Sequence, residues 1–244
     1  MGYHWNWGIF LEQVKGGEET YLDWLFTGLG WTVAVALTAW VIASILGVVF
    51  GTLRTTPQRG LVFLGNCWVE VFRNVPLLVQ MFLWFFVFPE LLPREWSLWV
   101  KQEMPAKEFV TAALCLGFFT SARIAEQFRA GIQSLPRGQT MAGLALGFTR
   151  PQTYRYVILP MAFRIVIPPM TSEFMNVFKN SSVAFAIGVL ELTFQARQMQ
   201  EDSEQGIETY AAVTVLYFLC AFIANRGMAF IEARTRVPGF IAGK

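Results

Sequence analysis

Polar side chains inside an otherwise apolar segment, residues 164–190, are the first candidates for chemistry. They recur at helical spacing and include Thr171, Glu173, Asn176, Lys179, Asn180 and Ser181. Ionisable groups at membrane depth are costly and usually face a bundle interior or a water-filled cavity. We therefore expect these residues to line one wall of a polar pathway. Lys179, or backbone N–H groups at a helix break near Asn180, would face a carboxylate there, and Glu173 would face an ammonium group. The alternative interpretation is a buried Glu–Lys pair that only holds helices together.

A second polar cluster interrupts the apolar segment at residues 61–88. Glu70 and Arg73 are three residues apart and are followed by Asn74, Pro76 and Gln80. Side chains three apart on a helix are neighbours, so we predict an ion pair between Glu70 and Arg73. Pro76 favours a helix break, and broken membrane helices usually line a cavity. We assign Glu70 a structural role and give Arg73 and Asn74 a mixed structural and pathway role, with Gln80 also on the pathway.

Motif content argues against an enzyme. His4 is the only histidine, and the sequence contains no H-E-x-x-H, G-x-S-x-G or G-x-x-x-x-G-K-[ST] motif. Cys67, Cys115 and Cys220 lie far apart in apolar runs, so we expect three buried hydrophobic side chains and no metal site. The basic residues flank apolar segments and do not form the separate stripe that a nucleic-acid site would need.

The elements that must position the polar residues are long apolar segments. The chain of 244 residues is 55% apolar and only 15% charged, whereas soluble domains carry about a quarter charged residues. About 20 apolar residues are enough to cross a bilayer as a helix. We therefore predict an all-α membrane protein that forms a single transmembrane domain over residues 1–244. Its five spans lie at about 25–53, 61–88, 109–130, 164–190 and 209–231.

Small and charged residues indicate where the spans meet. Gly47 and Gly51 have the G-x-x-x-G spacing that lets another helix approach closely. The alternative is that glycine is simply common in membrane helices. Arg123 interrupts the third apolar segment, and we expect it to snorkel to the interface and to pair with Glu126.

Charge asymmetry predicts the orientation. The loop after the first span, residues 134–160 and the C-terminal tail hold most of the basic residues, and the tail contributes Arg234, Arg236 and Lys244. Most acidic residues lie in the other loops. The positive-inside rule then places the N-terminus outside, and the C-terminus and residues 134–160 in the cytoplasm.

Residues 134–160 are basic and punctuated by glycine and proline, which predicts a helical hairpin. For its first helix, Ser134 is expected to act as the cap and Pro136 to lie in the first turn. Gly147 is expected to end this helix in a left-handed conformation. A capped hairpin outside the membrane suggests a docking element for a partner.

The second helix of the hairpin has its own start and stop signals. Thr149 and Gln152 have capping-box spacing, and Pro151 suits the first turn. This helix is expected to stop before Pro160, because proline disfavours a helical conformation in the residue that precedes it.

The end of the hairpin carries a spaced motif. It reads Met141-Ala142-Gly143, three residues, Gly147, nine residues, Val157, one residue, Leu159-Pro160. This resembles the EAA loop of ABC importer permeases, which is written E-A-A, three residues, G, nine residues, I, one residue, L-P. The spacing is kept throughout. The departures are Met141 for the acid, Gly143 for the second alanine and Val157 for isoleucine.

Other segments extend the resemblance over nearly the whole chain. Residues 71–80, V-F-R-N-V-P-L-L-V-Q, are similar to the F-R-G-T-P-L-L-V-Q segment of polar amino-acid permeases of the histidine/glutamine type. Residues 129–139 are similar to the segment that leads into their loop. Within this family the likeness is nearest to glutamate/aspartate permeases, and it rests on residues 5–11, 89–93 and 167–173.

The resemblance implies a type I ABC importer fold in the bacterial inner membrane. The expected complex contains a cytoplasmic ABC ATPase dimer, a second related permease (a heterodimer rather than a homodimer) and a periplasmic amino-acid-binding protein. ATP and Mg²⁺ would bind to the ATPase, and no cofactor to this chain. Residues implied in coupling to the ATPase are Met141, Ala142, Gly143, Leu144, Gly147, Leu159 and Pro160.

The function implied is transport of glutamate and aspartate along a path that this subunit helps to form. A permease of the same family for glutamine or another polar amino acid is one alternative. An ATP-independent carrier or channel, a membrane enzyme and a purely structural membrane subunit are alternatives of other classes.

Overall fold

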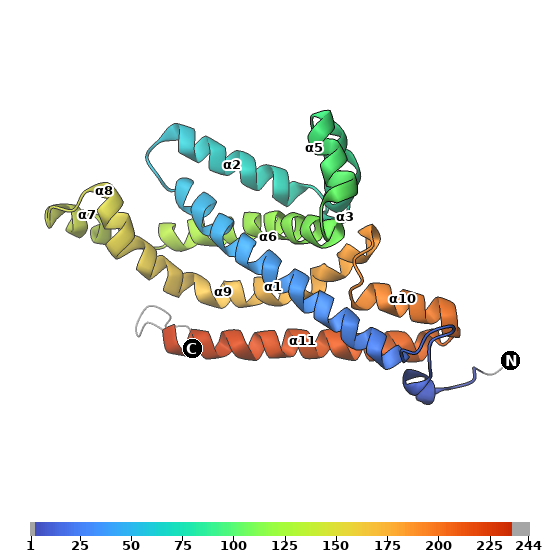
Figure 1. The fold of residues 1–244 in the computed structure, drawn as a ribbon. Helices are drawn as coiled ribbons and strands as arrows, with labels where there is room; N and C mark the ends of the chain where they lie inside the picture. Colours follow the sequence, from blue (N-terminus) through green and yellow to red (C-terminus); the bar gives the residue numbers. More distant parts are fainter. Residues whose placement is uncertain (1–2, 236–244) are drawn as a thin grey trace. The chain divides into compact units, whose positions relative to one another are not determined.

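The computed structural model describes residues 3–235 of the chain, and the predicted tail residues Arg236 and Lys244 lie outside this range. Within it the regular structure is helical, apart from an isolated antiparallel bridge between Gln13 and Thr20 (Figure 1). The helices are η1 (Trp7–Leu11), α1 (Tyr21–Leu53), α2 (Arg59–Asn74), α3 (Leu77–Phe82), η2 (Leu83–Val87), α4 (Phe88–Leu91), α5 (Arg94–Leu98), η3 (Trp99–Glu103), α6 (Lys107–Gln133), α7 (Arg137–Ala145), α8 (Arg150–Thr153), η4 (Tyr154–Ile158), α9 (Leu159–Asn180), η5 (Ser181–Ile187), α10 (Leu192–Ser203) and α11 (Gly206–Thr235). The predicted all-α membrane fold is confirmed.

Four of the described helices are long and apolar enough to cross a membrane. They cover Tyr21–Leu53, Lys107–Gln133, Arg150–Ile187 and Gly206–Thr235. A bent pair, Arg59–Asn74 followed by Leu77–Leu91, supplies a fifth candidate if it is counted as one span. The third of the long helices begins at Arg150, well before residue 164, where its span was predicted to start.

The bent pair is interrupted where the sequence contains Pro76. The two arms differ in direction by 103°. Val75 has extended backbone angles, φ −95° and ψ 131°, between the end of α2 and the start of α3. A proline ring clashes with a helical conformation of the residue before it, so Val75 leaves the helix and the chain turns.

The backbone contacts divide the chain into two compact units. The first comprises Met1–Trp40, Pro76–Gly117 and Asn176–Phe222, and the second comprises Val41–Val75, Phe118–Met175 and Ile223–Lys244. In the first unit, α10 packs on the first half of α1 and on α11, as Figure 1 shows. The residues buried in this contact are Leu25, Leu192, Ala196 and Val213.

A buried carboxylate fixes the start of α10 in the first unit. Glu191 caps this helix by accepting hydrogen bonds from the backbone N–H groups of Thr193, at 3.0 Å, and Phe194, at 2.9 Å. The hydroxyl of Tyr217 on α11 donates to the same carboxylate. Burial raises the pKa of Glu191, although these hydrogen bonds favour its charged form. The cap therefore ties α10 to α11.

Glycines let α1 and α6 approach closely in the second unit. A Cβ atom on Gly47 would lie 2.4 Å from Ile124 Cγ2, and one on Gly51 would lie 2.7 Å from Ala125 O. The close helix contact predicted for the G-x-x-x-G spacing is confirmed. It brings the end of α1, which leads to the first polar turn, directly against α6.

The helix α2 places Cys67 differently from the sequence prediction. Cys115 and Cys220 are buried as expected, but Cys67 is exposed. On α2 the buried positions are Gly65 and Val69, and Cys67 lies on another side of the same helix. The apolar context suggested burial, but such a context does not separate a protein core from a surface that faces lipid.

We expect Gly51→Ala to lower the free energy of unfolding by roughly 1–3 kcal/mol, the usual cost of overpacking a close contact. Its Cβ would meet both Phe128 Cβ, at 2.6 Å, and Ala125 O. Gly30→Ala is the matched control, because a Cβ at Gly30 on the same helix meets nothing within 4 Å. The thermal unfolding midpoints of the purified variants measure the difference. Equal midpoints would contradict the close contact.

Candidate functional site

The first helix of the hairpin, α7, begins without a side-chain cap. Pro136 is its N-cap residue, with φ −57° and ψ 133°, and α7 starts at Arg137. The Ser134 hydroxyl donates instead to the carbonyl of Gly131, at 2.8 Å. The prediction that Ser134 caps this helix, with Pro136 in the first turn, was wrong. Ser134 directly follows the last residue of α6, and its side chain bonds a carbonyl of the last turn of that helix.

The end of α7 is a Schellman motif centred on Gly147. Gly147 has φ +84°, so the predicted left-handed conformation is confirmed. The N–H of Gly147 donates to Leu144 O, at 3.0 Å, and the N–H of Phe148 donates to Gly143 O, at 3.1 Å. These bonds satisfy carbonyls at the helix end and reverse the chain within two residues.

The second helix of the hairpin begins with the predicted capping box. The Thr149 N–H donates to Gln152 Oε1, at 2.8 Å, and the Gln152 N–H donates to Thr149 Oγ1, at 3.4 Å. Pro151 occupies the first turn, as expected. The box fixes the backbone at the start of α8.

The prediction that this helix stops before Pro160 was wrong. The chain continues from α8 through one π-helical turn, Tyr154–Ile158, into α9. In that turn the N–H of Leu159 bonds to Tyr154 O, five residues back. A π-turn widens the helix and shifts its hydrogen-bond register, so the backbone passes Pro160 although a regular α-helical turn would clash with the proline ring. Pro168 and Pro169 also lie inside α9.

The two arms of the hairpin meet at Gly143 and Thr153, which are both buried. A Cβ atom on Gly143 would lie 2.7 Å from Thr153 Cγ2. The Thr153 hydroxyl donates to Thr149 O, at 3.0 Å, which fixes its rotamer. The glycine at the second-alanine position of the motif is therefore matched to the threonine opposite it.

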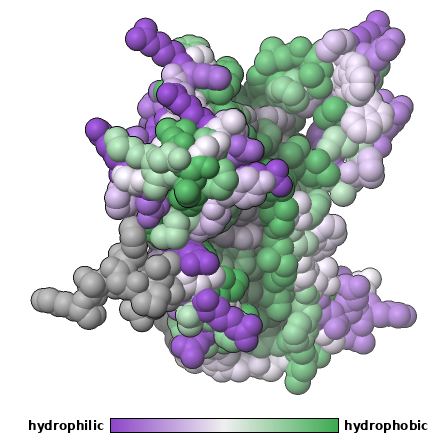
Figure 2. Space-filling view, turned by 90° about the vertical axis from the view of Figure 1, so that its left-hand side faces the viewer, coloured by the Kyte–Doolittle hydropathy of each residue, from purple (hydrophilic) through white to green (hydrophobic). Residues whose placement is uncertain are grey.

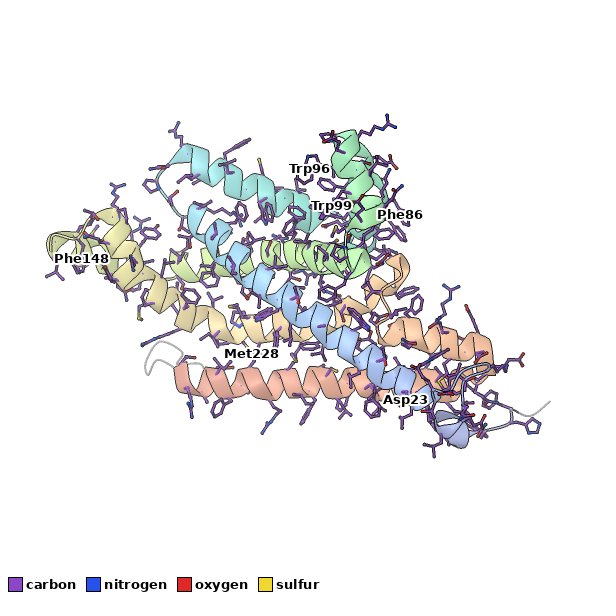
Figure 3. All side chains as sticks on the ribbon, viewed as in Figure 1. Asp23, Phe86, Trp96, Trp99, Phe148 and Met228 are labelled. Carbon is purple, nitrogen blue, oxygen red and sulfur yellow. The ribbon has the colours of Figure 1, made fainter. Side chains whose placement is uncertain are left out.

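The outer side of α7 exposes apolar side chains. Met141 is 67% exposed and Leu146 is 77% exposed. Figure 3 shows Phe148 at the turn that follows α7, and Figure 2 shows apolar side chains interspersed with polar ones on the side of the molecule that carries the hairpin. Ala142 and Leu144 are exposed on the same short helix. Exposed apolar residues next to polar ones are typical of an interaction surface.

Ionic and hydrogen-bonding groups anchor the base of the hairpin. The Tyr154 hydroxyl donates to Thr55 O, at 2.8 Å, which ties the start of the long helix to the turn after α1. Glu126 binds Arg54 Nη1 at 2.5 Å and also forms an ion pair with Arg129. Arg54 is largely buried, with 10% of its side chain exposed. Its buried positive charge is compensated by the Glu126 carboxylate.

A polar cluster joins α6 and α9 in the second unit. Arg123 Nη1 lies 3.7 Å from Glu173 Oε2, and Gln127 donates to Glu173 Oε1 at 3.4 Å. The predicted pair of Arg123 with Glu126 was wrong, because the Glu126 carboxylate is occupied by Arg54 and Arg129. The Arg123 side chain is 44% exposed, whereas that of Glu173 is 13% exposed. The arginine therefore has a free side that can meet a ligand.

Buried Thr171 lies with Glu173 in the second-unit part of α9, and the other residues of this apolar segment predicted to line the path lie in the first-unit segment that begins at Asn176. Lys179 is exposed, Asn176 and Asn180 are half-buried, and buried Ser181 donates to Phe178 O at 2.7 Å. The helix break expected near Asn180 does not occur, because α9 passes directly into the 3-10 helix η5. That helix ends at Gly188, which has φ +89°.

The cluster on α2 and α3 also differs from the prediction. Asn74 donates to Glu70 Oε2, at 2.6 Å, so the structure pairs Glu70 with Asn74 rather than with Arg73. Both lie one turn from Glu70, and the shorter Asn74 side chain satisfies the carboxylate. Arg73 is exposed on α2, and Gln80 is buried on α3.

The comparison with known families decides the class of the protein. Residues 43–237 match the family described as binding-protein-dependent transport system inner membrane component. The chain belongs to this family. It is a multi-pass transport component of the inner membrane, as predicted.

Relatives of this transport family match nearly all of the chain. The glutamate/aspartate import permease GltJ of Escherichia coli K12 is 48% identical over 100% of both chains. The glutamate/aspartate import permease GltK of Escherichia coli O6:H1 is 29% identical, over 88% of this chain and 94% of its own. A crystal structure of an amino acid ABC transporter with histidines is similar at a TM-score of 0.73 and 27% identity, over 88% of this chain and 95% of the other.

Sequence reasoning missed the roles of Arg123, Gln127 and Thr153. Arg123 and Gln127 are four residues apart, which places both on the side of α6 that meets Glu173. That spacing was a usable signal for a polar face of α6. No spacing in the sequence identified the partner of this face on α9. Thr153 gives no sequence signal, because its importance comes from the glycine it faces.

We expect Gly143→Ala to weaken the packing of the hairpin, because its Cβ would overlap Thr153 Cγ2. The double variant Gly143→Ala with Thr153→Ser removes that methyl group and keeps the hydroxyl that bonds Thr149. It should recover most of the thermal stability that the single variant loses. Proteolysis within residues 134–160 and the unfolding midpoint of the complex report the effect. If the double variant is no better than Gly143→Ala, this contact does not limit the residue at position 143.

Proposed function

We propose that this chain is a permease subunit of an ATP-driven importer for glutamate and aspartate. The observation that carries the proposal is the 48% identity with GltJ over the whole length of both chains. A match of that extent includes the transmembrane helices, the polar clusters and the hairpin together. ATP and Mg²⁺ would bind to a partner ATPase, since this chain has no phosphate-binding loop.

In this proposal the hairpin of residues 134–160 docks on the cytoplasmic ATPase. The residues that would make or support the contact are Met141, Ala142, Gly143, Leu144, Gly147, Leu159 and Pro160. The Schellman turn at Gly147 and the capping box at Thr149 hold α7 in one arrangement, so it moves as a unit. The helix continues without interruption from Arg150 to Ile187. A displacement at the hairpin therefore has a direct mechanical route into the membrane.

The exposed residue Met141 suggests how this hairpin contacts its ATPase. The related motif has an acid where this chain has methionine, so the contact here would be apolar at that position. Met141 and Leu146 together offer flexible apolar side chains next to the small Ala142. ATP would favour one conformation of the importer because the docked ATPase binds it more tightly in that state.

The substrate path is proposed to pass the polar cluster of α6 and α9. An acidic amino acid carries two carboxylates and one ammonium group. The partly exposed guanidinium of Arg123 can bind a carboxylate with two parallel hydrogen bonds, and Glu173 orients that guanidinium from its buried side. Other residues assigned to the path are Arg73, Asn74, Gln80, Asn176, Lys179, Asn180 and Ser181.

The complete importer is proposed to contain a second, related permease and a periplasmic binding protein. The similarity of this chain to both GltJ and GltK supports a heterodimer of two related subunits. The N-terminus would face the periplasm, and the C-terminus and hairpin the cytoplasm. Five spans, with the bent α2–α4 segment counted as one, would put the termini on opposite sides, and the charge asymmetry of the loops supports the cytoplasmic side for the C-terminus.

Uptake by the complete complex in proteoliposomes tests the substrate and the coupling. With binding protein and ATP present, we expect uptake of labelled glutamate and aspartate in preference to glutamine or arginine. Gly147→Val should abolish this uptake and uncouple or reduce ATP hydrolysis, since a β-branched residue is strained at φ +84°. Gly138→Val is the control, because Gly138 also lies in the hairpin but its added Cβ meets nothing within 4 Å.

Each outcome of that experiment separates the parts of the proposal. Preferential uptake of glutamine or arginine would keep the importer and exclude the acidic substrate. Uptake without ATP would exclude the ABC mechanism. Equal activity of the Gly147 and Gly138 variants would exclude the hairpin as the coupling element.

Exchanging the charges of Arg123 and Glu173 separates substrate binding from a structural role. We expect Arg123→Gln to raise KM for glutamate by about tenfold or more, the value of a charged hydrogen bond. The double variant Arg123→Glu with Glu173→Arg keeps an ion pair but moves the positive charge. It should remain impaired if Arg123 binds the substrate. Full recovery of uptake would show that the pair only holds α6 to α9.

A further inference from the structure

An apolar groove with two arginines lies beside the base of the hairpin in the second unit. Its volume is about 740 Å³. One wall comes from the end of α1 and the start of α2, with Thr52, Pro57 and Leu61. The other wall comes from the hairpin and the start of α9, with Arg150, Arg155 and Leu159. None of the residues that line the groove is acidic.

The groove has fixed walls. Tyr154 lines it, and its hydroxyl bonds to Thr55 O at 2.8 Å, which holds the hairpin side against the turn after α1. The capping box of Thr149 and Gln152 fixes the backbone on either side of Arg150. The groove is therefore a built feature of the second unit and does not depend on the exposed tip of the hairpin.

The groove lies near the ends of two candidate membrane spans. The candidate span of α1 ends at Leu53, and the candidate span that contains α9 begins at Arg150. Thr52 lies before the first of these limits and Pro57 lies after it, whereas the lining residues of the other wall all lie from Arg150 onward. A groove lined by apolar residues and by two exposed arginines suits a phospholipid, whose acyl chains are apolar and whose phosphate is anionic.

We propose that this groove binds an anionic phospholipid, with an acyl chain along Thr52, Leu61 and Leu159 and the phosphate at Arg150 and Arg155. Arginine suits this ligand because its planar guanidinium donates two parallel hydrogen bonds to phosphate oxygens. Because none of the lining residues is acidic, no carboxylate in the groove neutralises the positive charges of Arg150 and Arg155. Bound lipid would bridge the first polar turn and the hairpin, and would thereby stiffen the base of the coupling element.

Native mass spectrometry of the complete complex tests this site. Delipidated complex is incubated with phosphatidylglycerol or with phosphatidylcholine of the same acyl chains. We expect about a tenfold preference for the anionic lipid, given the attraction of each basic residue near a headgroup. The double variant Arg150→Gln with Arg155→Gln should lose the preference. Arg234→Gln is the matched control, because that guanidinium lies 4.4 Å from the Phe230 ring centroid and does not line the groove.

Equal retention of the two lipids by the unaltered complex would overturn the proposal, as would an unchanged preference in the Arg150/Arg155 variant. A photo-crosslinker in place of Leu61, activated in native membranes, gives a second readout on the folded complex. A phospholipid adduct supports the site, and a protein adduct would assign the groove to a subunit interface instead. Neither assay requires transport, so the result is independent of which amino acid is carried.

Discussion

The ion pairs of Glu126 hold the end of α1 against α6, near the start of the hairpin of residues 134–160. The Glu126 carboxylate pairs with Arg54 at the end of α1 and with Arg129 on α6. A guanidinium as buried as that of Arg54 needs such a partner, because an unpaired charge in this position is strongly destabilising. The pair is possible only because Gly47 and Gly51 let α1 lie close to α6. The close packing of α1 on α6 and the compensation of the Arg54 charge by Glu126 therefore depend on each other.

The local conformation of the hairpin could be predicted from the sequence, whereas its tertiary contacts could not. The capping box at Thr149 and the left-handed turn at Gly147 depend on groups within a few residues, and both predictions were confirmed. The partner of Arg123 depends on which face of α9 meets α6, and no short spacing encodes that. Intrahelical neighbours were therefore chosen for Arg123 and for Arg73, and both choices were wrong.

Pro160 shows why a reliable local rule can fail inside a continuous membrane helix. The rule concerns a regular α-helical turn, in which the proline ring meets a carbonyl of the preceding turn. A π-turn at Tyr154–Ile158 changes this geometry, so the helix continues past Pro160. Residues 150–187 therefore form one continuous helix, which runs from the second arm of the hairpin past Glu173.

Gly143 illustrates how a departure from the family motif follows from packing. The motif has alanine at this position, but Thr153 lies so close that a methyl group on residue 143 would overlap it. The larger threonine and the smaller glycine thus form one matched pair. The contact between α7 and the start of the long helix stays tight, so movement of the exposed surface around Met141 must carry Thr153 with it. In the proposed importer, this packing would transmit a displacement of α7 to the long helix that begins at Arg150.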